Sequence, residues 1–415
     1  MEEEIKVSFW AKHKGWIIAL IILLVLVIAF FALTMPSNGI LSNVTRNTPR
    51  GIPDCPADNS IFTHTPVMLD DFTGLVPLGN MDPSSHVFPT DHIYFHPEYD
   101  EELGMNHEVD VYAMGDMWIT QISSSQNSID GEVLHTDYSV NFAPCKDISG
   151  YFLHMTTLSD KLKNAFEENE AKCSSGKSTG GRDYETCQAR VKVEVSAGEK
   201  IATGGGLKNQ GAFDLGMLDY RIDPLKHANN KRWTSEKHKY TVCPFDQFVS
   251  PLREELTAKF SSMDGDPIVG KDDVCGRIDW DVVGTAQGVW FTKGFKGFSP
   301  EDTHLALAPH NYEVGKQTFS VGTSISGVES DTYLFDPKSQ GNLDLDFSRT
   351  VPGETYCYDL FVRDYINPPN QYTDRPFTML FQMPDEDSLK IKKGSSESCG
   401  SAPYELGSDY IEFER

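Results

Sequence analysis

Short apolar segments that alternate with polar residues constrain the fold of this chain more than any other feature. Runs such as 109–122, 190–205 and 317–327 place Val, Thr, Tyr or Trp at alternate positions, and Gly, Pro, Asn or Asp separates the runs. Side chains of a β-strand point alternately to the two faces of a sheet, so this period of two predicts strands. The chain is therefore expected to be mainly β.

Helical spacing is scarce and predicts two helices. Residues 158–173 keep Leu162 and Phe166 on one face behind a capping residue, Ser159. Residues 250–263 begin with a Ser-Pro pair and then place apolar residues at helical spacing.

An apolar run near the N-terminus predicts a membrane anchor. The segment from Trp16 to Leu33 has no charged residue, and it approaches the ~20 residues that a membrane-spanning helix needs. A cleaved signal peptide usually has a shorter apolar region and a small-x-small site, which this run lacks. Lysines precede it, so the positive-inside rule predicts a cytoplasmic N-terminus at 1–15, a single transmembrane anchor at 16–34 and extracytoplasmic residues 35–415.

The cysteines and the charge agree with an extracellular location. All 8 cysteines follow the apolar run, and none forms a Cys-x-x-Cys pair, which predicts up to four disulfides. Cys173 and Cys187 are expected to close a small loop, while the other pairings stay open. The net charge of −25 argues against a nucleic-acid partner.

Composition divides the extracytoplasmic part into four segments. Residues 35–64 are rich in Pro, Asn, Ser and Thr and predict a stalk, with a glycosylation sequon at Asn43. Residues 223–240 are polar and basic within an acidic chain, which predicts a linker. The expected domains are therefore 65–222 and 241–415, and the second is β-rich, has few helices and shows no familiar family pattern.

The first predicted domain carries a series of motifs whose order is informative. It begins with "HVFPTDHIYF", followed by "VDVYAMGDMWIT", "FLHMTTLS", "VEVSAGEKIATGG" and "GAFDLGMLDYR". This order resembles the lysostaphin-type zinc endopeptidases, whose β fold is called the duplicated hybrid motif. The resemblance covers residues 65–222 only and implies that fold for them.

The resemblance also implies a set of site residues. His86 and Asp91 take the places of the first His and Asp ligands of the family, although five positions separate them here and the family has four. His92 is the alternative to His86. Asp214 stands where the family has its last zinc-binding histidine, and His154 matches the histidine that assists catalysis.

One departure from the family pattern bears on activity. Ala212 occupies the position of a second catalytic histidine and cannot move a proton. A site of His86, Asp91 and Asp214 would accept zinc or another divalent cation such as Mg²⁺, Mn²⁺ or Ca²⁺, and no other cofactor is expected. Two carboxylate ligands weaken the acidifying effect of a metal on bound water, so catalysis is expected to be poor.

Three functions are therefore open. The first is a membrane-anchored pseudoenzyme that binds a cell-wall peptide, a glycan or a surface protein without cleavage. The second is an active metallohydrolase, a peptidoglycan or peptide endopeptidase that uses His86, Asp91, Asp214 and His154. The third is a structural envelope protein. For each of them the alternative stays open that Pro83 to His96 form only a polar loop without metal.

Overall fold

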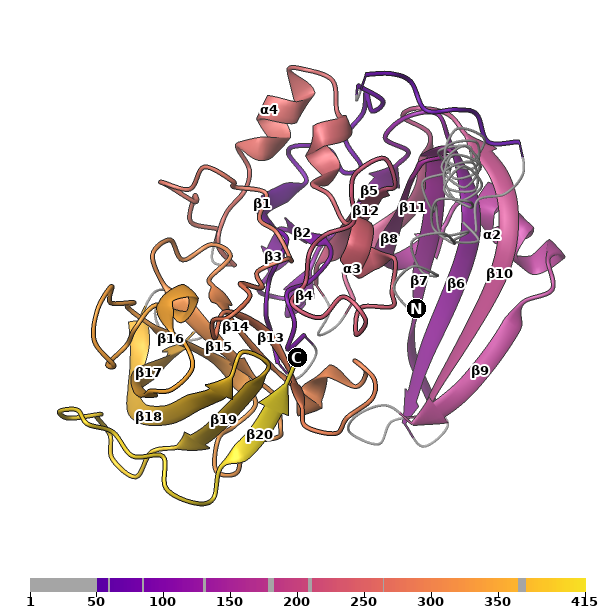
Figure 1. Cartoon of the computed structure of the whole chain (residues 1–415). Helices are drawn as coiled ribbons and strands as arrows, with labels where there is room; N and C mark the ends of the chain where they lie inside the picture. The colour runs from indigo at the N-terminus through magenta and orange to yellow at the C-terminus, as the bar shows by residue number, and fades with distance from the viewer. Residues whose placement is uncertain are drawn as a thin grey trace, which may run out of the picture. The chain divides into compact units, whose positions relative to one another are not determined.

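The computed structural model describes residues 51–415, apart from residues 59, 84–85, 130–131, 178–182, 208–210, 264 and 365–370. Residues Thr48–Arg415 form one compact unit. Its strands form a large sheet and a closed barrel, with a few short helices between them (Figure 1). The helices are α2 (Asp160–Glu168), α3 (Lys237–Tyr240) and α4 (Leu252–Thr257), with 3-10 turns η1 (Pro244–Gln247), η2 (Glu301–Thr303) and η3 (Phe347–Arg349).

The large sheet is ten-stranded and antiparallel. Its strands are β1 (Phe72–Val76), β2 (Ile93–Pro97), β5 (Glu108–Tyr112), β6 (Met117–Ile129), β7 (Glu132–Cys145), β8 (Ile148–Leu158), β9 (Lys172–Lys177), β10 (Asp183–Val195), β11 (Lys200–Gly205) and β12 (Phe213–Asp219). The order is β1-β2-β12-β8-β7-β6-β10-β9, and β11 pairs with β8 and β5. A separate pair joins β3 (Tyr99–Asp100) to β4 (Met105–Asn106).

The last strand of this sheet in sequence, β12, is an interior strand. β12 lies between β2 and β8, and each of its residues is buried. Phe213 of β12 packs against Phe95 of β2 and Phe152 of β8, with ring centroids 5.6 and 5.4 Å apart. Strands far apart in the sequence are thus fixed side by side by their apolar face, which leaves the other face of β12 to carry polar groups.

The second half of the chain forms a closed barrel. Its strands are β13 (Gly288–Thr292), β14 (Leu305–Pro309), β15 (Gln317–Val321), β16 (Asp331–Phe335), β17 (Thr355–Asp364), β18 (Gln371–Asp385), β19 (Ser388–Lys393) and β20 (Ile411–Glu414). Buried aromatic rings fill it, among them Phe319, Tyr358 and Phe381. The rings of Tyr358 and Phe381 stack at 4.4 Å between centroids.

The barrel also holds the loop that joins β1 to β2. Ser320 of β15 donates a hydrogen bond to the carbonyl of Val87 at 2.7 Å, and the N–H of Phe88 donates to Glu301 at 3.1 Å. The ring of Phe88 stacks on His304 at 5.4 Å. This loop contains His86, so the barrel fixes one side of the histidine-rich segment.

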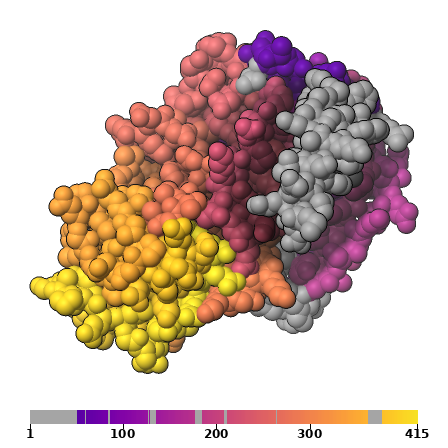
Figure 2. All heavy atoms as spheres, viewed as in Figure 1, coloured from indigo at the N-terminus to yellow at the C-terminus, as the bar shows by residue number. Residues whose placement is uncertain are grey.

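Residues 223–287 connect the sheet to the barrel and pack on the sheet. Phe245, Leu256 and Phe260 belong to the same hydrophobic core as the buried side of β2 and β12. Figure 2 shows this segment, in rose and salmon, on the surface between the magenta strands and the orange strands. The predicted domain boundaries at 222 and 241 stay predictions.

The cysteine prediction is confirmed. The chain contains four disulfides: Cys55–Cys145, Cys173–Cys187, Cys243–Cys275 and Cys357–Cys399. The Cys173–Cys187 loop is the one expected from the sequence, and it joins paired residues of β9 and β10. Four disulfides fit an extracellular protein.

The predicted fold class needs a correction, which concerns the N-terminal transmembrane helix. None of the helices in the described part of the chain combines the length and the apolar character that crossing a membrane requires. The predicted anchor at 16–34 lies outside the described residues. What the structure does show is a mainly β chain with a large sheet and an eight-stranded barrel, and the closure of the barrel was not predicted.

The two predicted helices differ in outcome. α2 follows Ser159 and buries Leu162, as the sequence indicates, but it ends at Glu168 because the chain turns into the edge strand β9. α4 occupies only Leu252–Thr257 of the longer helix expected at 250–263.

Candidate metal and ligand site

A pocket of about 560 Å³ opens where β2, β12 and β8 lie side by side. The register places Asp214 of β12 opposite Tyr94 of β2 and Leu153 of β8. Residues from distant parts of the sequence therefore meet at one level of the sheet. The lining residues are Asn80, Asp82, His86, His92, Tyr94, His96, Asn106, Leu153, His154, Gly211, Ala212, Asp214 and Met263.

Strand alternation brings two histidines to the pocket. His92 directly precedes β2, Tyr94 and His96 lie within it, and all three line the pocket. Side chains two positions apart share a face of a strand, while Phe95 between them points into the core. The sequence signal is the His-x-Tyr-x-His spacing, which the sequence analysis did not use.

His154 reaches the same pocket because β8 departs from regular strand geometry. Leu153 and His154 are consecutive and both line the pocket, whereas consecutive side chains of a regular strand point to opposite faces. The φ of His154 is 62°, in the left-handed region that residues other than glycine seldom adopt. Such a conformation costs roughly 1–3 kcal/mol and is concentrated at functional sites. The fold thus retains an unfavourable backbone at the residue that brings an imidazole to Asp214.

The carboxylate of Asp214 lies between two imidazoles at the base of the pocket. Its Oδ2 is 3.4 Å from Nε2 of His92 and 3.3 Å from Nε2 of His154. Its Oδ1 has no hydrogen-bond partner among the described residues. Burial raises the pKa of Asp214, but the two neighbouring imidazoles outweigh burial and hold this pKa below its ordinary value. Asp214 is therefore ionised although it is almost fully buried.

Two further carboxylates hold these imidazoles from behind. Oδ1 of Asp91 is 3.1 Å from Nδ1 of His92, and Oδ2 of Asp137 is 2.8 Å from Nδ1 of His154. When each Nδ1–H donates to its carboxylate, Nε2 of the same ring is left facing Asp214. A carboxylate behind a histidine is the usual arrangement around metal-binding imidazoles, because it fixes the ring and its tautomer.

His154 carries the positive charge that balances Asp214. Burial lowers the pKa of its imidazole, but Asp214 and Asp137 outweigh burial and raise the pKa to about 10. The ring is therefore protonated at neutral pH. A cation bound at Nε2 takes the place of this proton, so binding at His154 is expected to release a proton.

Two more histidines line the pocket without contributing to these ion pairs. The ring centroid of His86 lies 5.6 Å from that of His92. Burial, with the nearby His92, lowers the pKa of His86 to about 4, so its imidazole is neutral at neutral pH. Nε2 of His96 has no hydrogen-bond partner among the described residues, and burial lowers the pKa of His96 as well. Both rings line the pocket at positions where they can form hydrogen bonds with a bound ligand.

The distances from Asp214 to each imidazole fit a divalent cation, but the distance between the two imidazoles does not. Two ligands at 2.0–2.1 Å from a tetrahedral zinc ion lie roughly 3.3 Å apart, which matches the two distances from Asp214. The two imidazoles are not within 4.8 Å of each other, so they must approach to share one ion. Among the described residues, the only trio of ligand atoms within 4.8 Å is Cys173, Glu185 and Cys187, whose sulfurs form a disulfide and offer no thiolate.

The structure brings together three of the four residues predicted from the sequence. His86, His154 and Asp214 all line the pocket. Asp91 does not line it, and its carboxylate lies behind His92, the residue considered as the alternative to His86. The role of this set in metal binding stays a prediction.

Sequence reasoning missed one supporting carboxylate. Asp137 lies on β7 and contacts His154 on the neighbouring strand β8. No local spacing reveals this contact, because it depends on the register of the β7–β8 hairpin and on the irregularity of pairing near Tyr138.

Comparisons with protein-family profiles, with curated proteins and with solved structures found no match to this chain. The resemblance of residues 65–222 to the lysostaphin-type endopeptidases therefore stays a prediction from the sequence.

Proposed function

We propose that this protein binds a divalent cation, zinc foremost, in an extracellular compartment, and uses it to bind an oxygen atom of a peptide or glycan without cleaving the ligand. The observation that carries the proposal is the pair of Asp–His units, Asp91–His92 and Asp137–His154, that direct their Nε2 atoms at Asp214. The four disulfides support the extracellular location.

The proposed ligands are His92, His154 and Asp214. Two imidazole nitrogens and one carboxylate oxygen form a set that zinc accepts in proteins, with the fourth position left for water or a ligand. This set has one carboxylate fewer than the set of His86, Asp91 and Asp214, so it favours zinc over Mg²⁺ or Ca²⁺. Asp91 becomes a positioning residue in this proposal.

Binding without cleavage is preferred because neither of the two positions that the resemblance assigns to proton transfer, Ala212 and His154, offers a free group. Ala212 lines the pocket two residues before Asp214 and offers no titratable group. His154 faces the carboxylate directly, and as a metal ligand it is not free to move protons. General acid or base help contributes about 10²–10⁴-fold to such reactions.

Hydrolysis is the second candidate function, and one observation favours it. His86 and His96 line the pocket as neutral imidazoles outside the ion pairs, so either could act as a base toward a metal-bound water. Release of product from cell-wall peptides or from labelled peptides would support this candidate. Loss of that release in His86→Ala or His96→Ala, with zinc retained, would assign the base.

Metal analysis of the purified full-length chain tests the main proposal. Wild-type protein is expected to hold one zinc ion per chain after dialysis, and Asp214→Asn and His154→Ala are expected to lose it. His64→Ala is the matched control, because His64 is exposed and does not line the pocket. Thermal unfolding confirms that each variant is folded. Zinc at wild-type level in folded Asp214→Asn, or none in the wild type, would contradict the proposal.

A further inference from the structure

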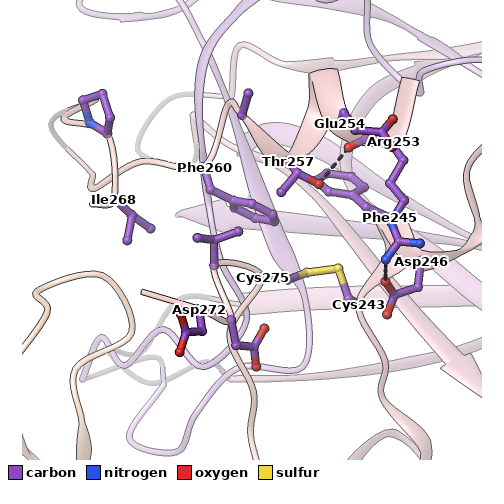
Figure 3. A pocket seen from close by; sticks show the side chains of 14 residues that line it. Cys243, Phe245, Asp246, Arg253, Glu254, Thr257, Phe260, Ile268, Asp272 and Cys275 are labelled. Carbon is purple, nitrogen blue, oxygen red and sulfur yellow. Dashed lines mark hydrogen bonds and ion pairs between the residues drawn. A yellow bond between two sulfur atoms is a disulfide. The ribbon is translucent and has the colours of Figure 1, made fainter. Parts of the chain in front are cut away.

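A second pocket, of about 600 Å³, lies beside the disulfide between Cys243 and Cys275. η1, α4 and the segment of residues 258–275 form its walls, and the disulfide joins the first wall to the last. Figure 3 shows Phe245 and Phe260 in this pocket, with Asp272 on one side of the disulfide and the ion pair of Asp246 and Arg253 on the other. None of its lining residues lines the histidine pocket.

The pocket is acidic, and most of its negative charge is not balanced. Asp246 is paired with Arg253 at 2.7 Å. The three other carboxylates that line it belong to Glu254, Asp272 and Asp273, and no ion pair between described residues includes them. The pocket therefore presents an excess of three negative charges at neutral pH.

Two lysines lie next to the pocket, and one of them offsets only part of its negative charge. Nζ of Lys259 donates to the carbonyl of Leu69 at 2.8 Å and lies over the ring of Phe72. Nζ of Lys271 donates to the carbonyl of Asn311, and burial lowers the pKa of Lys271 although the nearby carboxylate of Asp273 acts in the opposite direction. Both amino groups are held by other parts of the chain, and neither residue lines the pocket.

Apolar side chains line the pocket among these charges. Phe245 and Phe260 form its buried base, and Ile268 and Val274 are half-buried beside them. Val269, the next residue in the chain, does not line the pocket and is 78% exposed. A lone cation does not need such a surface, whereas a peptide with both charged and apolar side chains gains from it.

We propose that this pocket binds a cationic, partly apolar segment of a partner protein. A Lys or Arg side chain of the partner faces Glu254, Asp272 and Asp273, and an adjacent apolar side chain covers Ile268 and Val269. Charge complementarity selects this occupant, and the apolar surface distinguishes it from an inorganic cation. The inference goes beyond the proposed metal site and does not depend on it.

Peptide binding to the full-length chain tests this inference. The probe is a fluorescein-labelled peptide Lys-Leu-Arg-Leu, followed by fluorescence anisotropy, with Glu-Leu-Glu-Leu as the peptide of opposite charge. The basic peptide is expected to bind and to weaken as ionic strength rises from about 0.01 to about 0.15 M. The double variant Asp272→Asn and Asp273→Asn is expected to bind it about twofold to thirtyfold more weakly, since exposed ion pairs contribute roughly 0.2–1 kcal/mol each.

A matched double variant separates the pocket from the overall charge of the chain. Glu397→Gln with Glu405→Gln removes the same charge from exposed carboxylates outside the pocket and should leave peptide binding unchanged. The measurements are made on protein treated with a chelator, which keeps this test independent of the metal proposal. Three results would overturn the inference: equal weakening by the control, displacement of the peptide by Ca²⁺ alone, or self-association of the chain that the Asp272 and Asp273 changes abolish.

Discussion

The large sheet and the barrel both bury polar side chains, among them Asp214 in the sheet and Ser320 in the barrel, but the rest of their interiors differ. The sheet buries the ionised Asp214 beside His92, and it keeps His154 with a left-handed backbone to do so. The interior of the barrel is filled with aromatic side chains such as Phe319 and Phe381. Buried charge is costly unless it is paired, so it persists where a function requires it. In the proposed function, the sheet carries the binding site and the barrel is its scaffold.

The largest expected effect tests the barrel as a scaffold. Phe381→Ala removes a fully buried ring that stacks on Tyr358, and it is expected to lower the free energy of unfolding by about 3–5 kcal/mol. Zinc bound per folded chain is expected to stay the same, because the ring lies outside the histidine pocket. Urea unfolding and metal analysis of the folded fraction measure the two quantities. Loss of zinc from folded protein would show that the two regions are not separable in function.

In the sheet, a substitution behind His154 is expected to change zinc affinity more than the free energy of unfolding. Asp137→Asn weakens the contact behind His154 and is expected to lower zinc affinity about 10–100-fold, as loss of a carboxylate behind a metal-binding histidine does. The free energy of unfolding without zinc should change much less. Competition with a chromogenic chelator gives the affinity.

A matched carboxylate outside the pocket provides the control for this prediction. Asp100 contacts His107 at 3.2 Å in a similar Asp–His pair, and neither residue lines the pocket. Asp100→Asn is therefore expected to leave zinc affinity unchanged. Equal losses in the two variants would mean that Asp137 does not act through His154.

The same comparison explains how much could be predicted from the sequence. Period-two alternation predicts the strands, and the order of motifs selects His154 and Asp214, which the structure places 3.3 Å apart. His96 was missed although its spacing from His92 is local, because the alternation was used for strands and not for the face that the histidines share. Asp137 depends on strand register, which the sequence does not display.

The closure of the barrel and the acidic pocket are two features that local sequence patterns do not predict. Closure requires β13 to pair with β20, more than a hundred positions later in the chain, and no spacing within either strand encodes that pairing. In the sequence, Asp272 and Asp273 resemble an ordinary turn. They line a pocket in the structure because the disulfide brings Cys243 beside Cys275. Long-range pairing, rather than residue type, decides both features.

The smallest expected effect concerns the loop between β1 and β2, which the barrel holds where the two regions meet. Glu301 accepts the N–H of Phe88, and burial raises the pKa of Glu301 from 4.5 to about 7. The folded state therefore binds this proton more tightly than the unfolded state, so the stabilisation is complete below about pH 4.5 and is lost as pH rises through 7. Glu301→Gln keeps an acceptor for Phe88 but does not titrate.

Between about pH 5 and pH 7.5, wild-type stability is expected to fall relative to that of Glu301→Gln. Urea unfolding across this range measures the difference, with the exposed Glu386→Gln on the barrel as the control. Identical pH dependence in wild type and Glu301→Gln would show that this carboxyl is not buried as described. If Glu301→Gln instead changes zinc affinity, the barrel helps to position the loop that contains His86. The metal site would then depend on this loop and on the barrel as well as on the sheet.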